Sequence, residues 1–249
     1  MTESAEQQTS IKIAAVGDLH TGQGDKGRWN ELFSQASGEA DVLLICGDLT
    51  DTGDEAEAET LAIELKACKI PVLAVLGNHD YEKSRQKLIR QIMQQAGVCM
   101  LDGESVVLKN VGFAGIKGFG GGFDKHMLSM FGEPAMKAFV QEAVNEALAL
   151  DRAIFKLYQQ DPEMRIVAMM HYSPIQSTIE GEPEVIYPFL GSSRLAEPFG
   201  KRKIAAAFHG HAHVGTLEGQ TAEGVKVYNV ALPVLKKNGL QAGYLICNL

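Results

Sequence analysis

The sequence lacks most of the features that mark secreted, membrane-spanning or nucleic-acid-binding proteins. Its four cysteines show no Cys-x-x-Cys spacing, which is typical of reduced thiols in a cytoplasm. No apolar run approaches the roughly 20 residues needed to span a bilayer. Lys and Arg number 23 against 31 Asp and Glu, and a net charge of −8 argues against a general nucleic-acid or membrane-surface binder. We therefore expect a cytoplasmic protein with neither of these partners.

The chain also lacks internal repeats, low-complexity tracts and recognisable linkers. Residues 1–10 are polar and acidic, so we expect a flexible tail there and no signal peptide. Residues 11–249 are expected to form a single domain. The apolar content of 45% is sufficient for a buried core.

Apolar runs alternate with helical patterns through the first part of the chain, as in right-handed βαβ units. The pattern predicts strands at 11–16, 42–46, 71–76, 105–108, 111–116, 165–170, 204–208, 214–218, 225–230 and 244–247. It predicts helices at 28–36, 54–66, 83–95 and 134–160, and a short helix that begins near residue 192 or 193. Two such halves favour an α/β fold in which two mixed sheets pack together with helices outside.

Polar side chains suited to metal binding follow five of the predicted strands. In open α/β sheets, ligands gather at the carboxyl ends of the strands. The five strand ends are followed by Asp18-x-His20, Gly47-Asp48-x-x-Asp51, Gly77-Asn78-His79-Asp80, His171 and Gly210-His211-x-His213. Asp, Asn and His are hard-to-borderline ligands of divalent metals. Of these residues, Asp48 is the one we expect to bridge two ions, because a single carboxylate can do so.

These five blocks, in this order, resemble those of the calcineurin-like metallophosphoesterases. The resemblance spans residues 18 to 213 and implies a four-layer αββα sandwich with two metal ions at the edges of the sheets. Carried over residue by residue, it implies two ligand sets: Asp18, His20, Asp48 and His213 for one ion, and Asp48, Asn78, His171 and His211 for the other. It also implies that His79 contacts the substrate phosphate and that Asp51 orients His79.

The implied reaction is hydrolysis of a phosphoester. Two ions about 3.5–4 Å apart clamp the attacking and leaving oxygens and lower the pKa of a bridging water, so that a metal-bridging hydroxide is the nucleophile. Asp18 and Asp48 bring two negative charges against about four positive charges from the ions, so an anionic phosphate is attracted despite the net −8. The oxygen and nitrogen ligands suit Mn, Fe or Zn, as divalent ions or as a mixed-valence pair.

Within the resemblance, the residues next to the motifs favour a small substrate. Ser/Thr protein phosphatases carry Arg and Glu where this chain has Thr52 and Asp80. The string from Gly47 to Gly53 is more similar to the bacterial branch that contains cyclic-nucleotide phosphodiesterases. We expect a phosphodiesterase acting on a small organic phosphate such as a nucleotide. A phosphomonoesterase or a nucleotide pyrophosphate hydrolase is the alternative, and a non-catalytic protein-binding scaffold is a remote one.

Two further segments are candidates for substrate contact. Arg194, in the sequence Ser192-Ser193-Arg194 at a predicted helix start, is a candidate anion-binding residue, with a capped helix and a solvated Arg as the alternative. The Gly-rich residues 117–132 are expected to form a mobile cover near the site, because glycines are costly to fix and long insertions are often lids. The sequence leaves the oligomeric state open, with a homodimer as one option.

Overall fold

The computed structural model describes residues 10–249 and contains two mixed sheets. The first sheet has the order β11-β1-β2-β3-β4, in which β1 to β4 are parallel and β11 is antiparallel to β1. Its strands are β1 (Lys12–Val16), β2 (Val42–Cys46), β3 (Val72–Val75), β4 (Cys99–Met100) and β11 (Leu245–Asn248).

The second sheet has the order β5-β6-β7-β8-β10-β9. Its strands are β5 (Glu104–Leu108), β6 (Val111–Gly115), β7 (Arg165–Met169), β8 (Ile204–His209), β9 (Glu218–Gln220) and β10 (Lys226–Asn229). The four central strands β6, β7, β8 and β10 are parallel, and the two edge strands are antiparallel to their neighbours. Each sheet therefore presents a row of parallel strands that end on one edge.

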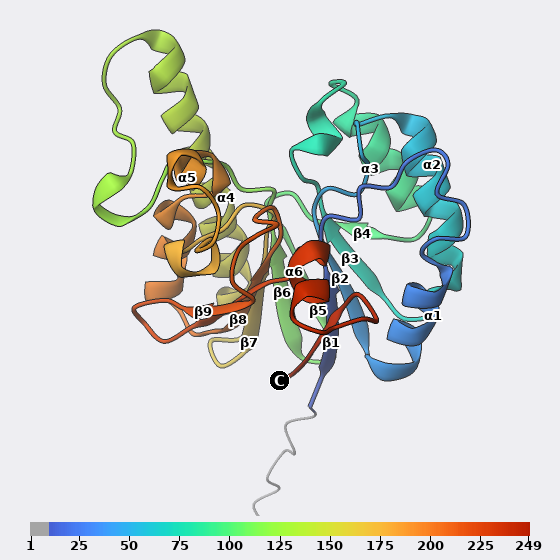
Figure 1. Cartoon of the computed structure of the whole chain (residues 1–249). Coiled ribbons are helices and arrows are strands. Elements are labelled where there is room, and N and C mark those ends of the chain that lie inside the picture. Colours follow the sequence, from blue (N-terminus) through green and yellow to red (C-terminus); the bar gives the residue numbers. More distant parts are fainter. Residues whose placement is uncertain (1–9) are drawn as a thin grey trace, which may run out of the picture.

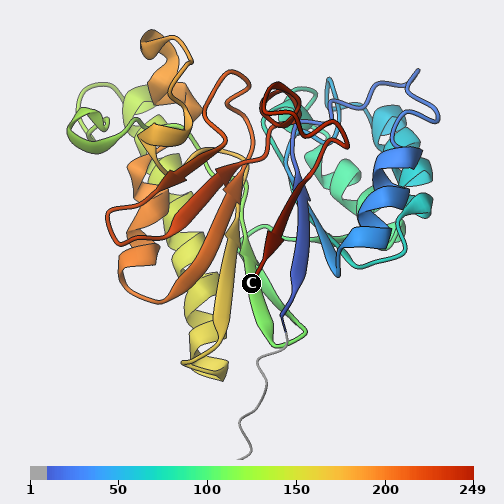
Figure 2. The same ribbon diagram turned by 60° about the horizontal axis from the view of Figure 1, so that its bottom comes forward.

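Helices cover the outer faces of the two sheets. The long ones are α1 (Asn30–Glu39), α2 (Glu55–Glu64), α3 (Gln86–Gln95) and α4 (Pro134–Gln160), and two short helices, α5 (Tyr187–Leu190) and α6 (Leu232–Lys237), lie in connections between strands. Figures 1 and 2 show α1, α2 and α3 beside the first sheet and the long α4 beside the second. The layers are helix, sheet, sheet, helix, which confirms the predicted α/β sandwich.

Alternating side chains on β6 and β7 show how the second sheet is covered on both faces. Phe113 and Met169 belong to the core that includes the first sheet. Their neighbours Ala114 and Ala168 belong to a second core built with α4. Successive residues of a strand point to opposite faces, so an apolar run without alternation is what a sheet buried on both sides requires. The same reasoning explains why β2 is buried at all five positions.

Most of the predicted elements are confirmed within one to three residues at their ends. The predicted helix at 134–160 matches α4. The predicted strand at 214–218 is wrong, because the residues around His213 form a turn in which Gly215 N donates to Ala212 O at 3.2 Å, and β9 begins only at Glu218. The pattern also missed β4, α5 and α6, which are only 2, 4 and 6 residues long.

The Gly-rich residues 117–132 do not form one free loop. Gly121 N donates to Pro188 O at 2.7 Å, Gly122 N donates to Gly191 O at 2.9 Å, and Phe123 is only 2% exposed. A Cβ at Gly120 would meet Pro188 O closely, so these glycines let two backbones approach. Residues 117–123 are therefore held by packing and backbone hydrogen bonds, unlike the mobile cover expected from the sequence. Residues 124–133 are the more exposed part, with Phe131 64% exposed.

Four of the predicted metal ligands have left-handed backbone conformations. Asp18, His20, Asp48 and His211 have φ of 59°, 45°, 48° and 70°. The spacing of Asp18 and His20 predicts that they share a side of an extended segment. They do share a site, but tight turns after the strand bring them there. Such conformations are uncommon outside glycine and persist where the surrounding structure enforces them.

Candidate metal centre

All seven predicted metal ligands lie together where strands from both sheets end. The turns after β1, β2, β3, β7 and β8 carry Asp18, His20, Asp48, Asn78, His171, His211 and His213. In each of two groups, Asp18–His20–His213 and Asp48–His171–His211, the candidate ligand atoms lie within 4.8 Å of one another. Asn78 joins the second group through its Oδ1, 2.8 Å from His171 Nε2.

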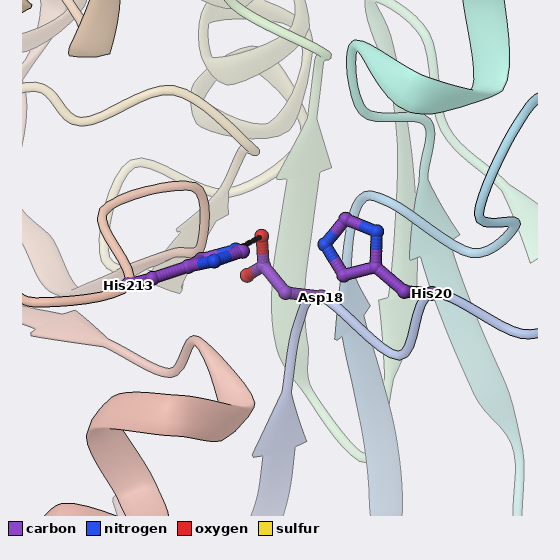
Figure 3. Close-up of side chains that lie close together, drawn as sticks. All are labelled: Asp18, His20 and His213. Atoms are coloured by element: carbon purple, nitrogen blue, oxygen red, sulfur yellow. Dashed lines mark hydrogen bonds and ion pairs between the residues drawn. The ribbon is translucent and has the colours of Figure 1, made fainter.

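Asp18 is the centre of the first group. Its Oδ1 lies 3.0 Å from His213 Nε2, and His211 N donates to both carboxylate oxygens at 3.0 Å. Figure 3 shows the Asp18 carboxylate between the imidazoles of His20 and His213. The hydrogen bond with Asp18 raises the pKa of His213. A buried carboxylate, 2% exposed, is thus held by backbone and faced by two imidazoles.

His171 is the most constrained ligand of the second group. It is fully buried, and its Nδ1 lies 3.0 Å from Cys46 O. A carbonyl only accepts, so Nδ1 carries a proton and the lone pair of a neutral ring lies on Nε2, 3.4 Å from Asp48 Oδ2. Burial lowers the pKa of His171, but the charges of Asp48 and Asp18 and the hydrogen bonds with Asp48 and Cys46 O together raise the pKa to about 9. A divalent ion at Nε2 would take the place of this extra proton.

Asp48 faces both groups. The same Oδ2 that approaches His171 lies 3.7 Å from His20 Nε2, and Asp48 is 1% exposed. His20 Nε2 is buried without a hydrogen-bond partner. A buried ring nitrogen without a partner is costly unless a cation or donor satisfies it. These residues therefore fit two metal ions that share the Asp48 carboxylate.

Two glycines make room for the buried ligands. A Cβ at Gly77 would collide with the Asp48 carboxylate, and one at Gly47 would collide with the His171 ring. Gly47 also has a φ of +84°, which favours glycine. Each glycine in the Gly-Asp and Gly-Asn motifs thus has a steric reason of its own.

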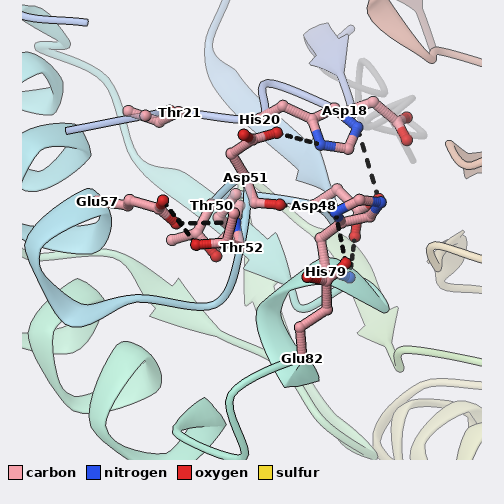
Figure 4. Close-up of polar contacts among 12 residues, drawn as sticks. Asp18, His20, Thr21, Asp48, Thr50, Asp51, Thr52, Glu57, His79 and Glu82 are labelled. Carbon is pink, nitrogen blue, oxygen red and sulfur yellow. Dashed lines mark hydrogen bonds and ion pairs between the residues drawn. The ribbon is translucent and has the colours of Figure 1, made fainter. Parts of the chain in front are cut away.

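His79 lies beside the metal ligands, and its surroundings differ from those expected. Its ring centroid is 4.5 Å from that of His20, and its backbone N donates to Asp48 Oδ1 at 2.9 Å. His79 Nδ1 lies 2.7 Å from the backbone O of Asp51 and 3.0 Å from Glu82 Oε1. The Asp51 carboxylate is directed at His20 instead, with Oδ1 3.6 Å from His20 Nδ1 (Figure 4). Asp51 thus contacts His79 through its main chain.

Asp80 forms no hydrogen bond with His79 through its carboxylate and is instead held by the neighbouring turns. Its buried carboxylate accepts hydrogen bonds from the backbone N of Leu49, Thr50 and Gly77 and from Thr50 Oγ1. Burial, together with the charge of Asp48, raises the pKa of Asp80 to about 6. Asp80 therefore ties the turn after β3 to the turn after β2, and so fixes the spacing of the ligands on these turns.

Arg194 is not brought to the two ligand groups. Its guanidinium lies 3.5 Å from Leu128 O and 3.9 Å from Glu197 Oε1, beside α4. The Ser192 side chain accepts from Arg194 N and caps the 3₁₀ helix Ser193–Gly200. These contacts match the alternative of a capped helix, so substrate binding by Arg194 stays a prediction without structural support.

Three contacts of the site were missed by sequence reasoning. Glu82 lies three residues after His79, a helical spacing that could have been noticed. Cys46 O and Phe189 O, 3.1 Å from His211 Nε2, act through the main chain and leave no signal in residue type. Such partners fix which ring nitrogen of each His is left for a metal.

The sequence matches the family described as calcineurin-like phosphoesterase over residues 11–215. This chain belongs to that family. Its members use dinuclear divalent metal centres, and the two groups that Asp48 faces are the candidate ligands here. As a calcineurin-like phosphoesterase, the chain is a metal-dependent phosphoester hydrolase.

Solved structures share the fold at low sequence identity. A Phosphopantetheinyl Hydrolase from Mycobacterium tuberculosis is 14% identical with a TM-score of 0.69, and 95% of each chain is covered. TT1561 of Thermus thermophilus is 14% identical with a TM-score of 0.59, covering 96% of this chain and 99% of that one. A putative 5'-nucleotidase from Staphylococcus aureus is 14% identical with a TM-score of 0.55, covering 89% of this chain and 48% of that one. No curated protein matches the sequence.

Proposed function

We propose that this calcineurin-like phosphoesterase is a phosphodiesterase acting on a small organic phosphate such as a nucleotide. The observation that carries the proposal is the position of Asp48 Oδ2, 3.7 Å from His20 Nε2 and 3.4 Å from His171 Nε2. One carboxylate between two ligand groups is what a pair of ions acting on a single phosphoryl group requires. When bound, two such ions supply a hydroxide nucleophile and neutralise charge on the phosphoryl oxygens.

The charges around the site favour a diester over a monoester. Within residues 10–249, no Lys or Arg side chain is hydrogen bonded or ion paired to the seven ligands or to His79. A monoester dianion carries one more charge than a diester, and proteins usually match such charge with Arg or Lys. A singly charged diester needs less compensation beyond the ions.

The contacts of His79 support a role on the bound diester that does not require it to hold a metal. Its Nδ1 is occupied by Asp51 O and Glu82 Oε1, which leaves Nε2 as the ring nitrogen for substrate. In the protonated ring, Nδ1–H is held by these two acceptors, and Nε2–H donates to a phosphoryl oxygen or to the departing alkoxide. General acid assistance is worth about 10²–10⁴-fold and matters most for poor leaving groups.

The test is a comparison of two esters with the same leaving group. Protein loaded with Mn, Fe or Zn is assayed on bis(p-nitrophenyl) phosphate and on p-nitrophenyl phosphate. We expect a kcat/KM at least about tenfold higher on the diester, which corresponds to roughly 1.4 kcal/mol. A preference for the monoester would overturn the proposal and favour the phosphomonoesterase. Phosphopantetheinyl esters and nucleotide pyrophosphates complete the panel, because one solved structure with this fold is a Phosphopantetheinyl Hydrolase.

The expectations on location, partners, domain organisation and metal identity belong to this proposal. Across residues 10–249, no helix combines the length and the apolar character needed to cross a bilayer. A cytoplasmic location, the absence of a nucleic-acid partner, the single domain over 11–249 and the choice among Mn, Fe and Zn stay predictions. The expected tail at 1–10 lies outside the described residues except for Ser10.

A further inference from the structure

A row of aromatic side chains starts and ends at the metal ligand His211. The ring of Tyr172 lies 4.4 Å from that of His211, and Phe119 lies 5.8 Å from Tyr172, between centroids. Phe139 follows at 4.9 Å from Phe119, and Phe189 at 6.1 Å from Phe139. The last residue of the row also contacts His211 through its main chain, because Phe189 O is 3.1 Å from His211 Nε2. The row therefore borders the second ligand group.

The four aromatic residues come from different elements that are fixed to one another. Tyr172 follows β7, Phe119 lies in the Gly-rich segment, Phe139 is on α4 and Phe189 is on α5. The hydrogen bond from Gly121 N to Pro188 O ties the Gly-rich segment to α5 beside Phe189. The row is thus built on hydrogen-bonded backbone, as a rigid binding surface requires.

The inner part of the row is already occupied. Lys117 Nζ lies 4.9 Å from the ring centroid of Phe119 and 5.4 Å from that of Tyr172. Its side chain is 8% exposed and pairs with Glu146 at 3.5 Å. The Lys117 ammonium thus forms cation–π contacts with the faces of Phe119 and Tyr172. The outer rings, Phe139 and Phe189, have no such partner among the residues described.

Exposure increases along the row away from the metal ligands. Tyr172 is 8% exposed, Phe119 and Phe139 are half-buried, and Phe189 is 58% exposed. A large aromatic ring left in water beside a ligand group is unfavourable unless another apolar group covers it. The backbone O of Phe189 contacts His211 Nε2, so this surface adjoins the second ligand group.

We infer that Phe139 and Phe189 form a subsite for a planar ring on the substrate of the proposed phosphodiesterase. The inference rests on the proposed function, because the phosphoryl group must be held at the two ligand groups for its ester group to reach the subsite. Aromatic rings pair with one another in offset or edge-to-face geometry. Phe side chains offer no hydrogen bonds, so the subsite distinguishes a ring from an alkyl chain and does not distinguish one ring from another. The substrate class is then a diester with an aryl or heteroaromatic group.

Binding of two phosphonates to the metal-loaded protein tests this inference without turnover. Methylphosphonate and 1-naphthylphosphonate carry the same anionic group, and only the second has a ring. Calorimetric titration of the wild-type protein should give a Kd roughly tenfold lower for naphthylphosphonate, the effect expected of one ring–ring contact. Phe189→Ala should remove most of this difference and leave the Kd of methylphosphonate unchanged. Phe189→Tyr, which keeps a ring, should retain it.

Phe155→Ala is the matched control. Phe155 is 42% exposed on the same helix as Phe139, and its ring is covered by Arg202 at 4.9 Å. This variant should bind both phosphonates as the wild type does. If naphthylphosphonate binds no more tightly than methylphosphonate, or if Phe189→Ala weakens both equally, the subsite is excluded. If neither phosphonate binds the metal-loaded wild type, the subsite is excluded as well, and the proposed function is judged separately by the rates on the two p-nitrophenyl esters.

Discussion

Asp48 Oδ2 lies 3.4 Å from His171 Nε2, although Asp48 follows β2 of the first sheet and His171 follows β7 of the second. The contact is short because His171 Nδ1 is fixed on Cys46 O, at the end of β2. The second ligand group is thus assembled across the junction of the two sheets. Any change at Asp48 affects both ligand groups and the junction together.

Removal of Asp48 should reduce both metal occupancies. Asp48→Ala deletes the only carboxylate that faces His20 and His171 at once among the residues described. Asp18→Ala deletes a carboxylate that contacts His213 and should lower mainly one occupancy. Elemental analysis of metal-reconstituted protein measures both. A full complement of two ions in Asp48→Ala protein would show that the carboxylate is not shared.

His79→Ala should keep both metals and lose rate in proportion to how poor the leaving group is. Alkyl phosphodiesters should slow by about 10²–10⁴-fold, because an alkoxide needs a proton to leave. p-Nitrophenyl diesters should slow much less, since p-nitrophenolate leaves without one. Equal losses on both substrates would point to phosphate binding by His79 in place of acid catalysis. Loss of a metal would identify His79 as a ligand.

Gly77→Ala should weaken metal binding and destabilise the fold, because the added Cβ collides with the Asp48 carboxylate. Overpacking of this kind costs about 1–3 kcal/mol. Gly38→Ala is the control: Gly38 lies in α1, and its Cβ would meet nothing within 4 Å. That variant should be up to about 1 kcal/mol more stable, because Ala is the better helix former. Urea denaturation of the metal-free proteins measures the stability loss in Gly77→Ala and the gain in Gly38→Ala. An unchanged stability of Gly77→Ala would contradict the steric argument.

Lys117→Met should destabilise the protein by about 3–5 kcal/mol, because it leaves the Glu146 carboxylate buried without its partner. Burial already raises the pKa of Glu146, so the native state binds more protons than the unfolded chain between the two pKa values. The contribution of Glu146 to stability is therefore lost as the pH rises from its unfolded pKa through its native pKa. The loss in Lys117→Met should be larger at pH 8 than at pH 5.

Two variants control for this prediction and are measured by urea denaturation at both pH values. Adding Glu146→Gln to Lys117→Met should recover much of the lost stability and remove its pH dependence. Lys226→Met breaks an exposed pair with Glu218 and should change stability by no more than about 1 kcal/mol. Similar losses of stability for Lys117→Met and Lys226→Met would mean that the buried pair contributes no more to the free energy of unfolding than the exposed pair.

The convergence of the candidate metal ligands could be predicted from sequence, because these residues closely follow apolar runs. Val42–Cys46 and Arg165–Met169 are buried strands whose ends are marked by a sudden change to Asp or His. Contacts made through main-chain atoms could not be predicted in this way, since any residue type carries a carbonyl. The partner of His79 Nδ1 is such a case: the residue, Asp51, was predicted, but the contacting atom is its backbone O.

The Gly-rich segment was misjudged for a related reason. A run of glycines indicates either a flexible backbone or a close approach of two backbones, and sequence does not distinguish the two. Here the close approach depends on Pro188 and Gly191, which lie far along the chain and whose carbonyls accept hydrogen bonds from Gly121 N and Gly122 N. The position of Arg194 could not be predicted for the same reason, because it depends on where the helix capped by Ser192 directs the chain beside α4.

The contact between His213 and Asp18 joins residues 195 positions apart. Neither half of the chain contains a complete ligand group by itself, so the centre forms only when the two sheets have docked. Contacts this distant in sequence are slow to form during folding. Metal uptake should therefore follow docking in time, and a chain still in synthesis would carry no active centre until the turn after β8 has been made. The site then serves as a marker of completed folding.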